Sequence, residues 1–285
     1  MITLRKVFSK EPHVVRNRER YFRILQDFRI YAEKLSIEAG NIKKLSSKGT
    51  HYTRFLLYLT VLYEEIFQEE FGLLDSFVAL KKLKLIENLP DFRTFNRKEH
   101  NFYSATINCF AAYLTNRQAL KEAPSDNFLN FQLASLTTEE GILISEENAE
   151  FQADKLVVRP KKSLYQGFDS YPRNLNVSYL AKVRSKWSCN LDSRHRSFIT
   201  QADGKNFVEA HHLIPMAVQD YYLYTLDFTD NVTTLCPNCH RLVHHAGYRE
   251  REIAINKLFG ERESTYRQHG IEINQKLLLS FYGII

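Results

Sequence analysis

A chain of 285 residues with 44% hydrophobic side chains can bury the core of one large domain or of two domains of ordinary size. No apolar run approaches the roughly 18 residues that a membrane-spanning helix needs, so we expect no membrane partner. The segment 1–15 is basic but lacks the apolar centre of a secretory signal, which makes the cytoplasm the expected location. The formal net charge of +6 gives only a hint of an anionic partner.

Charge is unevenly distributed along the chain. Residues 1–50 carry 12 basic and 5 acidic side chains, and residues 152–188 carry 8 and 2. Residues 122–151 carry 7 acidic side chains and no basic ones. Two basic blocks with an acidic spacer could bind a polyanion through separate surfaces. Charge alone leaves the alternative of ordinary solvated helix faces equally open.

The first predicted domain, 1–118, is all-α. Apolar spacing and helix caps mark four helical segments in it: 14–39, 51–70, 76–89 and 97–116. Asn96 and Glu99 form a capping-box pattern at the start of the last segment. Residues 119–164 are acidic at their start and weakly periodic, so they are expected to be a linker.

The helical segments between residues 46 and 114 contain SSKGTHYTRFLLYLTVLYEE and DSFVALKKLKLIENLPDFRTFNRKEHNFYSATINCFAAYL. In rhythm, though not through a specific motif, they resemble the core-binding domain of tyrosine recombinases. The resemblance implies that the domain 1–118 recognises DNA. The alternative is a generic helical bundle.

The region between residues 189 and 245 holds six of the ten histidines and three of the four cysteines. Two pairs stand out in it: Cys189-x5-His195 and Cys236-x2-Cys239. Such pairs, about forty residues apart, suit a tetrahedral Zn²⁺ held by three thiolates and one imidazole, a closed structural site. Asp192 also lies near Cys189 and is the alternative to His195 as the fourth ligand.

A second pattern interlocks with the first and comprises His211, His212, Asn231, His240 and His244. Residues 207–211 can form a strand, on which neighbours face opposite ways, so His211 and His212 cannot readily share one ligand. His240 and His244 are four residues apart, which places them on one face of a helix. One divalent metal can then be held by the helix pair and a strand side chain, with positions open for phosphate and water.

The segments FVEAHHLIPM and DFTDNVTTLCPNCHRLVHH resemble the HNH, or ββα-metal, nuclease superfamily. They are most similar to its restriction-type, McrA-like branch, which has an interleaved zinc site. The resemblance covers about residues 172–282 and includes the upstream Tyr171-Pro172-Arg173. It implies a nuclease domain over 165–285, with a ββα core that a structural zinc ion holds together. C-terminal helices are expected to follow this core at 249–268 and 273–282.

The resemblance also implies a role for each matching residue. His212 corresponds to the general base that activates water, and Asn231 to the residue that pins the loop and orients the base. His211 and His240 correspond to ligands of the catalytic metal, and His244 to a further metal ligand or a phosphate contact. Relatives often have Asp at the position of His211, which leaves Mg²⁺, Mn²⁺ and Ni²⁺ open as the catalytic ion. Arg241 could contact phosphate or could be a solvated arginine.

The sequence therefore predicts an α+β protein that hydrolyses phosphodiester bonds of double-stranded DNA. We expect a restriction or defence endonuclease whose recognition depends on sequence or base modification. A mobile-element or phage-type nuclease is the first alternative, and a non-catalytic zinc module that only binds DNA is the second. One active site cuts one strand, so a double-strand break is compatible with a homodimer.

Overall fold

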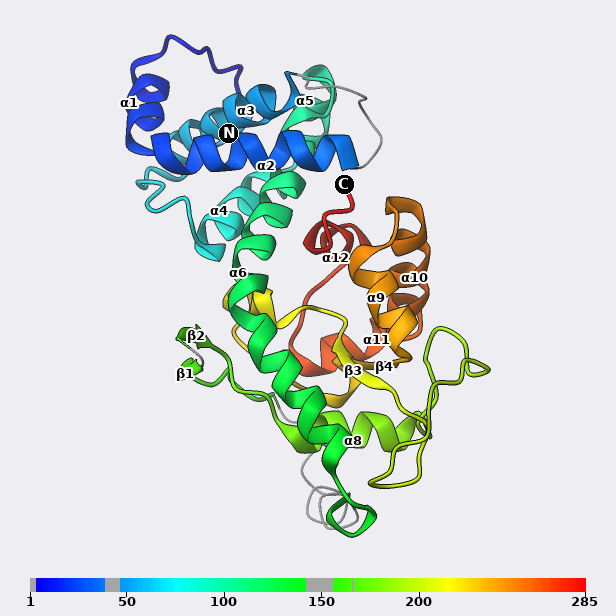
Figure 1. The fold of residues 1–285 in the computed structure, drawn as a ribbon. Coiled ribbons are helices and arrows are strands. Elements are labelled where there is room, and N and C mark those ends of the chain that lie inside the picture. The colour runs from blue at the N-terminus through cyan, green and yellow to red at the C-terminus, as the bar shows by residue number, and fades with distance from the viewer. Residues whose placement is uncertain (1–3, 39–46, 142–155, 166) are drawn as a thin grey trace. The chain divides into compact units, whose positions relative to one another are not determined.

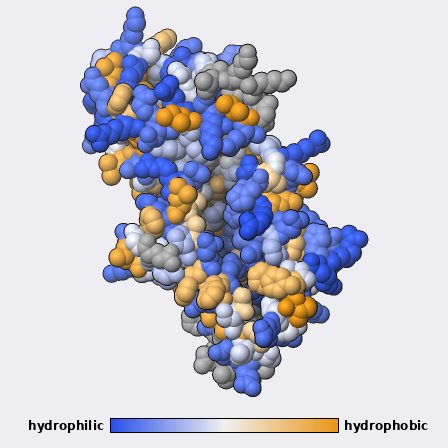
Figure 2. Space-filling view, viewed as in Figure 1, coloured by the Kyte–Doolittle hydropathy of each residue, from blue (hydrophilic) through white to orange (hydrophobic). Residues whose placement is uncertain are grey.

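The computed structural model describes residues 4–38, 47–141, 156–165 and 167–285. The described elements are mostly helices, accompanied by two small two-stranded sheets, as an α+β fold requires (Figure 1). The chain divides into two compact units, Met1–Asn116 with Ser280–Ile285, and Arg117–Leu279. No helix of the described ranges is long and apolar enough to cross a membrane. Hydrophilic side chains cover most of the face that Figure 2 shows.

The first unit is built from helices packed through aromatic side chains. Its elements are α1 (Pro12–Arg20), α2 (Phe22–Glu38), α3 (Lys48–Phe67), α4 (Phe77–Glu87), α5 (Phe92–Lys98) and the first part of α6 (Phe102–Ser135). Phe28 of α2 meets Phe110 of α6 edge to face at 5.4 Å. Gly49 of α3 lies so close to α2 that a Cβ would come within 2.5 Å of the Arg29 carbonyl oxygen. Glycine at this position therefore permits the helices to pack closely.

Two helix boundaries in this unit differ from the prediction. The segment expected as one helix over 14–39 is broken at Tyr21, whose hydroxyl donates to the Gly72 carbonyl at 2.7 Å. The helix expected from residue 97 begins at Phe102 instead. Asn96 lies inside α5, and its side-chain oxygen accepts from the backbone N–H of Ser104 at 3.2 Å. Asn96 therefore does cap the start of α6, but it does so from within α5. The predicted capping box with Glu99 is not what forms this cap.

The segment 119–135 is helical, where a linker was expected. Helix α6 continues through Pro124 to Ser135. Within the second unit, Glu122 forms a 3.1 Å ion pair with Arg173, and the two side chains are 2% and 3% exposed. Burial raises the pKa of Glu122, and the charge of Arg173 opposes that rise. Of the acidic residues that suggested a linker, Glu122 and Asp126 are therefore partners of a buried arginine. Residues 142–155 of the predicted linker lie outside the described residues.

The second unit contains both sheets, the rest of α6, the helices from α8 to α11 and the first part of α12. Strands β1 (Ser163–Tyr165) and β2 (Phe168–Ser170) form a hairpin, and α8 (Leu175–Arg184) follows with Asn174 as its N-cap. The other sheet pairs β3 (Glu209–His212) antiparallel with β4 (Val232–Leu235). Helices α9 (Pro237–His245), α10 (Tyr248–Gly260), α11 (Glu263–Tyr266) and α12 (Gln275–Phe281) complete the chain, with short 3₁₀ turns at Met216–Tyr221, Thr229–Asn231 and Arg267–His269.

The order β3, β4, α9 gives the ββα arrangement expected around the histidines. Cys236 follows β4 directly and caps α9, so the sheet leads into the helix without a loop. The core beneath the sheet contains Ala210, Val232 and, from α6, Leu129 and Leu133. The helix expected over 249–268 is divided into α10 and α11 by a break at residues 261–262.

Candidate metal centres

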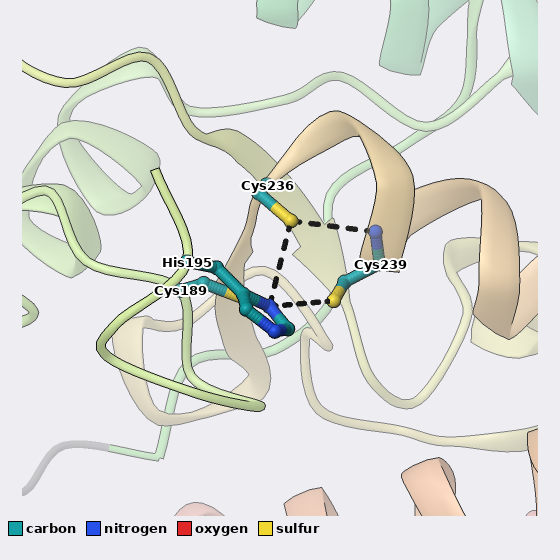
Figure 3. A group of neighbouring side chains, drawn as sticks. All are labelled: Cys189, His195, Cys236 and Cys239. Atoms are coloured by element: carbon teal, nitrogen blue, oxygen red, sulfur yellow. Dashed lines mark hydrogen bonds between the residues drawn. The ribbon is translucent and has the colours of Figure 1, made fainter. Parts of the chain in front are cut away.

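Three thiols and one imidazole converge at the start of α9 (Figure 3). The cysteine cluster comprises Cys189, His195, Cys236 and Cys239, whose ligand atoms all lie within 4.8 Å of one another. His195 Nδ1 is 3.2 Å from the Cys239 sulfur and 3.8 Å from the Cys236 sulfur. Ligands of a tetrahedral zinc lie roughly 3.3–3.8 Å apart, given bond lengths of about 2.0–2.3 Å. The residues therefore fit a zinc ion.

The electrostatics of the cysteine cluster also favour a cation. Burial opposes ionisation of Cys189, but backbone N–H groups of Cys236 and Asp192 lower its pKa to about 7. Burial and the neighbouring Cys236 raise the pKa of Cys239. Without an ion, the first thiolate thus disfavours the next, and a divalent cation removes that conflict.

Asp192, the alternative fourth ligand, pairs with Arg194. Its carboxylate accepts from Arg194 Nη2 at 2.7 Å and from the Arg194 backbone N–H at 2.9 Å. These hydrogen bonds to Arg194 lower the pKa of Asp192. The structure therefore places His195, and not Asp192, among the grouped ligand atoms.

A second group lies between β3 and α9. The histidine cluster comprises His211 of β3 with His240 and His244 of α9, again with ligand atoms within 4.8 Å of one another. The three ring centroids are 4.9–5.0 Å apart. His245 is the next residue of α9 and lies outside the group.

The histidine cluster is electrostatically suited to hold a cation through neutral rings. Burial, followed by the charges of His244 and His240, lowers the pKa of His211 well below its usual value. Burial and His240 lower the pKa of His244 to about 4. Neutral imidazole is the form that binds metals.

Glu209 orients one ring of the histidine cluster. Its carboxylate lies 2.8 Å from His240 Nδ1, so Nε2 is the nitrogen left to face a metal. This hydrogen bond to His240 lowers the pKa of Glu209. A carboxylate behind a ligating histidine is a common support of metal sites.

His212 lies apart from the histidine cluster. Alternation along β3 turns its side chain away from that of His211. Its Nε2 is 2.9 Å from the Asp227 carboxylate, and the two side chains are 5% and 8% exposed. The structure thus separates the two neighbouring histidines, as the strand pattern predicted.

Asn231 ties together the connection between β3 and β4. Its side-chain N–H groups donate to the carbonyls of Ile214 and Leu226 at 3.0 and 2.8 Å. Its side-chain oxygen accepts from the Ile214 N–H at 2.8 Å. Asn231 therefore links Ile214, near the start of this connection, to Leu226, which directly precedes Asp227.

Two residues of these sites were missed in the sequence. Glu209 stands two positions before His211 and shares its face of the strand, so alternation could have indicated it. Asp227 lies in an irregular segment four residues before Asn231, where no periodicity points to His212.

Arg241, which the sequence analysis named as a possible phosphate contact, is exposed on α9 beside His240.

Comparison with known proteins gives a match over part of the chain. Residues 194–246 match the family described as HNH endonuclease, a segment that includes both clusters except for Cys189. The Type IV methyl-directed restriction enzyme EcoKMcrA of Escherichia coli (strain K12) is 34% identical over 76 residues, which are 27% of this chain and 25% of that enzyme. The chain thus spans about a quarter of the length of this relative. No solved structure matches the chain.

Proposed function

Because residues 194–246 match the HNH endonuclease family, with McrA-like similarity as the motifs predicted, we propose that this protein is a metal-dependent endonuclease that hydrolyses double-stranded DNA. The observation that carries the proposal is the separation of two histidine functions on β3. His211 joins His240 and His244 in a group able to hold a metal, while His212 is paired with a carboxylate outside that group. Metal binding alone does not require this second arrangement, whereas a hydrolytic site needs a base beside its metal.

The proposed chemistry assigns each group one task. His211, His240 and His244 hold a divalent ion, and Glu209 fixes the His240 ring through Nδ1. When bound, the ion would supply Lewis-acid stabilisation of the phosphate charge and of the departing oxygen. His212 takes a proton from the attacking water as general base. Mg²⁺, Mn²⁺ and Ni²⁺ are the candidate ions, and an all-imidazole set favours the softer two.

The cysteine cluster is proposed to bind structural zinc. Its four ligands leave no open position for water, unlike the three of the histidine cluster. Zinc there would join the segment after α8 to the start of α9, and α9 carries His240 and His244. Folding of the site and binding of zinc are then coupled.

DNA recognition is assigned to the first unit. Its N-terminal basic excess is the supporting feature, although Arg5, Arg16 and Arg20 pair with glutamates of the same unit. The exposed Arg241 on α9 is proposed to contact phosphate near the cut. Similarity to a methyl-directed restriction enzyme supports a role in restriction, with base modification as a candidate signal.

A nicking assay tests the proposal. Purified protein is incubated with supercoiled plasmid and Mg²⁺, Mn²⁺ or Ni²⁺, and plasmids with and without cytosine methylation are compared. We expect nicking with at least one ion and none in chelator. His240→Ala should abolish nicking, whereas His245→Ala, on the same helix but outside the histidine cluster, should not. Absence of nicking by the wild-type protein with every ion and both plasmids would favour the non-catalytic zinc module.

A further inference from the structure

Asp227 receives hydrogen bonds on both of its carboxylate oxygens. Oδ1 lies 2.9 Å from His212 Nε2, and Oδ2 accepts from the backbone N–H of Asn174 at 2.6 Å. We propose that Asp227 is the positioning residue of His212, holding the hydrogen on Nε2 so that Nδ1 is free to take the proton of water. The inference deepens the proposed nuclease function and rests on it.

The identity of the partner decides the tautomer of His212. An ionised carboxylate has no hydrogen to donate, so a neutral imidazole next to it must carry its own hydrogen on the facing nitrogen. That nitrogen is Nε2. Nδ1 is then the basic nitrogen of the ring, and rotation about the side chain is opposed by the hydrogen bond. Because both side chains are at most 8% exposed, water competes poorly for this bond.

Asp227 is itself held in place from two sides. Its backbone N–H donates to Thr225 Oγ1 at 3.1 Å. Asn174, which donates to Oδ2, is the N-cap residue of α8, so a helix terminus anchors the carboxylate. Asp227 can therefore fix the orientation of the His212 ring and does not merely follow it.

The anchoring by Asn174 makes the effect of one substitution specific. In Asp227→Asn the amide must present its oxygen to the Asn174 N–H, since two donors cannot face each other. Its NH₂ group then points at His212 Nε2 and donates to it. The hydrogen of the neutral His212 ring must then lie on Nδ1. The ring keeps its position, but Nδ1 can no longer accept a proton from water. The same logic underlies the loss of rate when the aspartate of a serine-protease triad becomes asparagine.

The experiment reads the tautomer directly in the full-length chain. Imidazole ¹⁵N shifts are recorded at about pH 8, above the ordinary histidine pKa of about 6.5, and His212 is assigned by its loss in His212→Ala. We expect hydrogen on Nε2 in the wild type and on Nδ1 in Asp227→Asn. Nicking at saturating DNA should fall roughly 10²–10⁴-fold in Asp227→Asn, as for loss of a general base, with DNA affinity and metal content unchanged. Asp227→Glu, which keeps an acceptor-only group, should recover part of the rate.

Asp230→Asn is the matched control. Asp230 lies three residues further along the same segment and faces His269 Nε2 at 3.3 Å, with no bond to His212. It should leave both the His212 tautomer and the rate unchanged. A wild-type His212 with hydrogen on Nδ1, or an Asp227→Asn variant that keeps the wild-type tautomer and rate, would overturn the inference. The wild-type spectrum decides even if Asp227→Asn does not fold, and it does so whether or not the protein nicks DNA.

Discussion

Removing the side chain of Asn231 should destabilise the second unit more than the small size of this side chain suggests. The residue is fully buried, and its amide makes four hydrogen bonds. Asn231→Ala would leave three backbone groups without these partners: the N–H and carbonyl of Ile214 and the carbonyl of Leu226. Each buried group left unpaired costs about 1–3 kcal/mol. Water entering the vacated space would recover part of this, so we expect the free energy of unfolding to fall by about 3–5 kcal/mol.

Urea denaturation monitored by circular dichroism measures the change, with Asn127→Ala as control. Asn127 is exposed on α6, so its removal should alter stability by no more than about 0.5 kcal/mol. Asn231→Asp should be worse at neutral pH than in acid, because an ionised carboxylate would face the carbonyls of Ile214 and Leu226. A loss of less than about 1 kcal/mol for Asn231→Ala would refute the reasoning, since it would mean that these backbone groups do not depend on the amide.

Three further predictions follow from the two clusters and the buried ion pair. Cys236→Ala should abolish bound zinc, measured by elemental analysis, and sharply lower solubility, whereas Cys109→Ala should keep the zinc because Cys109 lies outside the cysteine cluster. With no divalent ion added and no chelator, so that the cysteine cluster keeps its zinc, the urea midpoint should fall as pH drops below about 6.5, because the pKa of His244 is lowered to about 4 and the unfolded chain takes up protons first. His244→Ala should flatten this slope, and an unchanged slope would argue against a neutral cluster. Glu122→Ala should cost about 3–5 kcal/mol in urea denaturation by leaving Arg173 incompletely paired, against about 0.5 kcal/mol for the exposed Glu139→Ala.

The sequence predicted the candidate site better than it predicted the helix boundaries. Strand alternation at His211 and His212 and helical spacing at His240 and His244 are local rules, and the structure groups His211, His240 and His244 as these rules indicated. The family match over 194–246 confirms the resemblance drawn from those residues. Their catalytic and metal-binding roles stay predictions.

The features missed in the sequence depend on contacts between distant residues. The stretch from residue 119 was expected to be a linker because of its acidity, yet Glu122 pairs with an arginine 51 positions later. Helix α6 also continues through Pro124. Asp227 reaches His212 from an irregular segment, so no periodic pattern could indicate the contact. Contacts between residues far apart in the sequence, and not the local secondary-structure propensity, determine the structure at these positions.

We propose that two adjacent histidines have different tasks, His212 as general base and His211 as metal ligand. The measurement that tests it most directly compares His212→Ala with His211→Ala, using calorimetry for affinity of the activating metal and plasmid nicking for rate. We predict that His212→Ala keeps wild-type metal affinity while its rate falls roughly 10²–10⁴-fold, and that His211→Ala loses both affinity and rate. A His212→Ala variant that nicks at the wild-type rate, or a His211→Ala variant that keeps full metal affinity, would contradict the account.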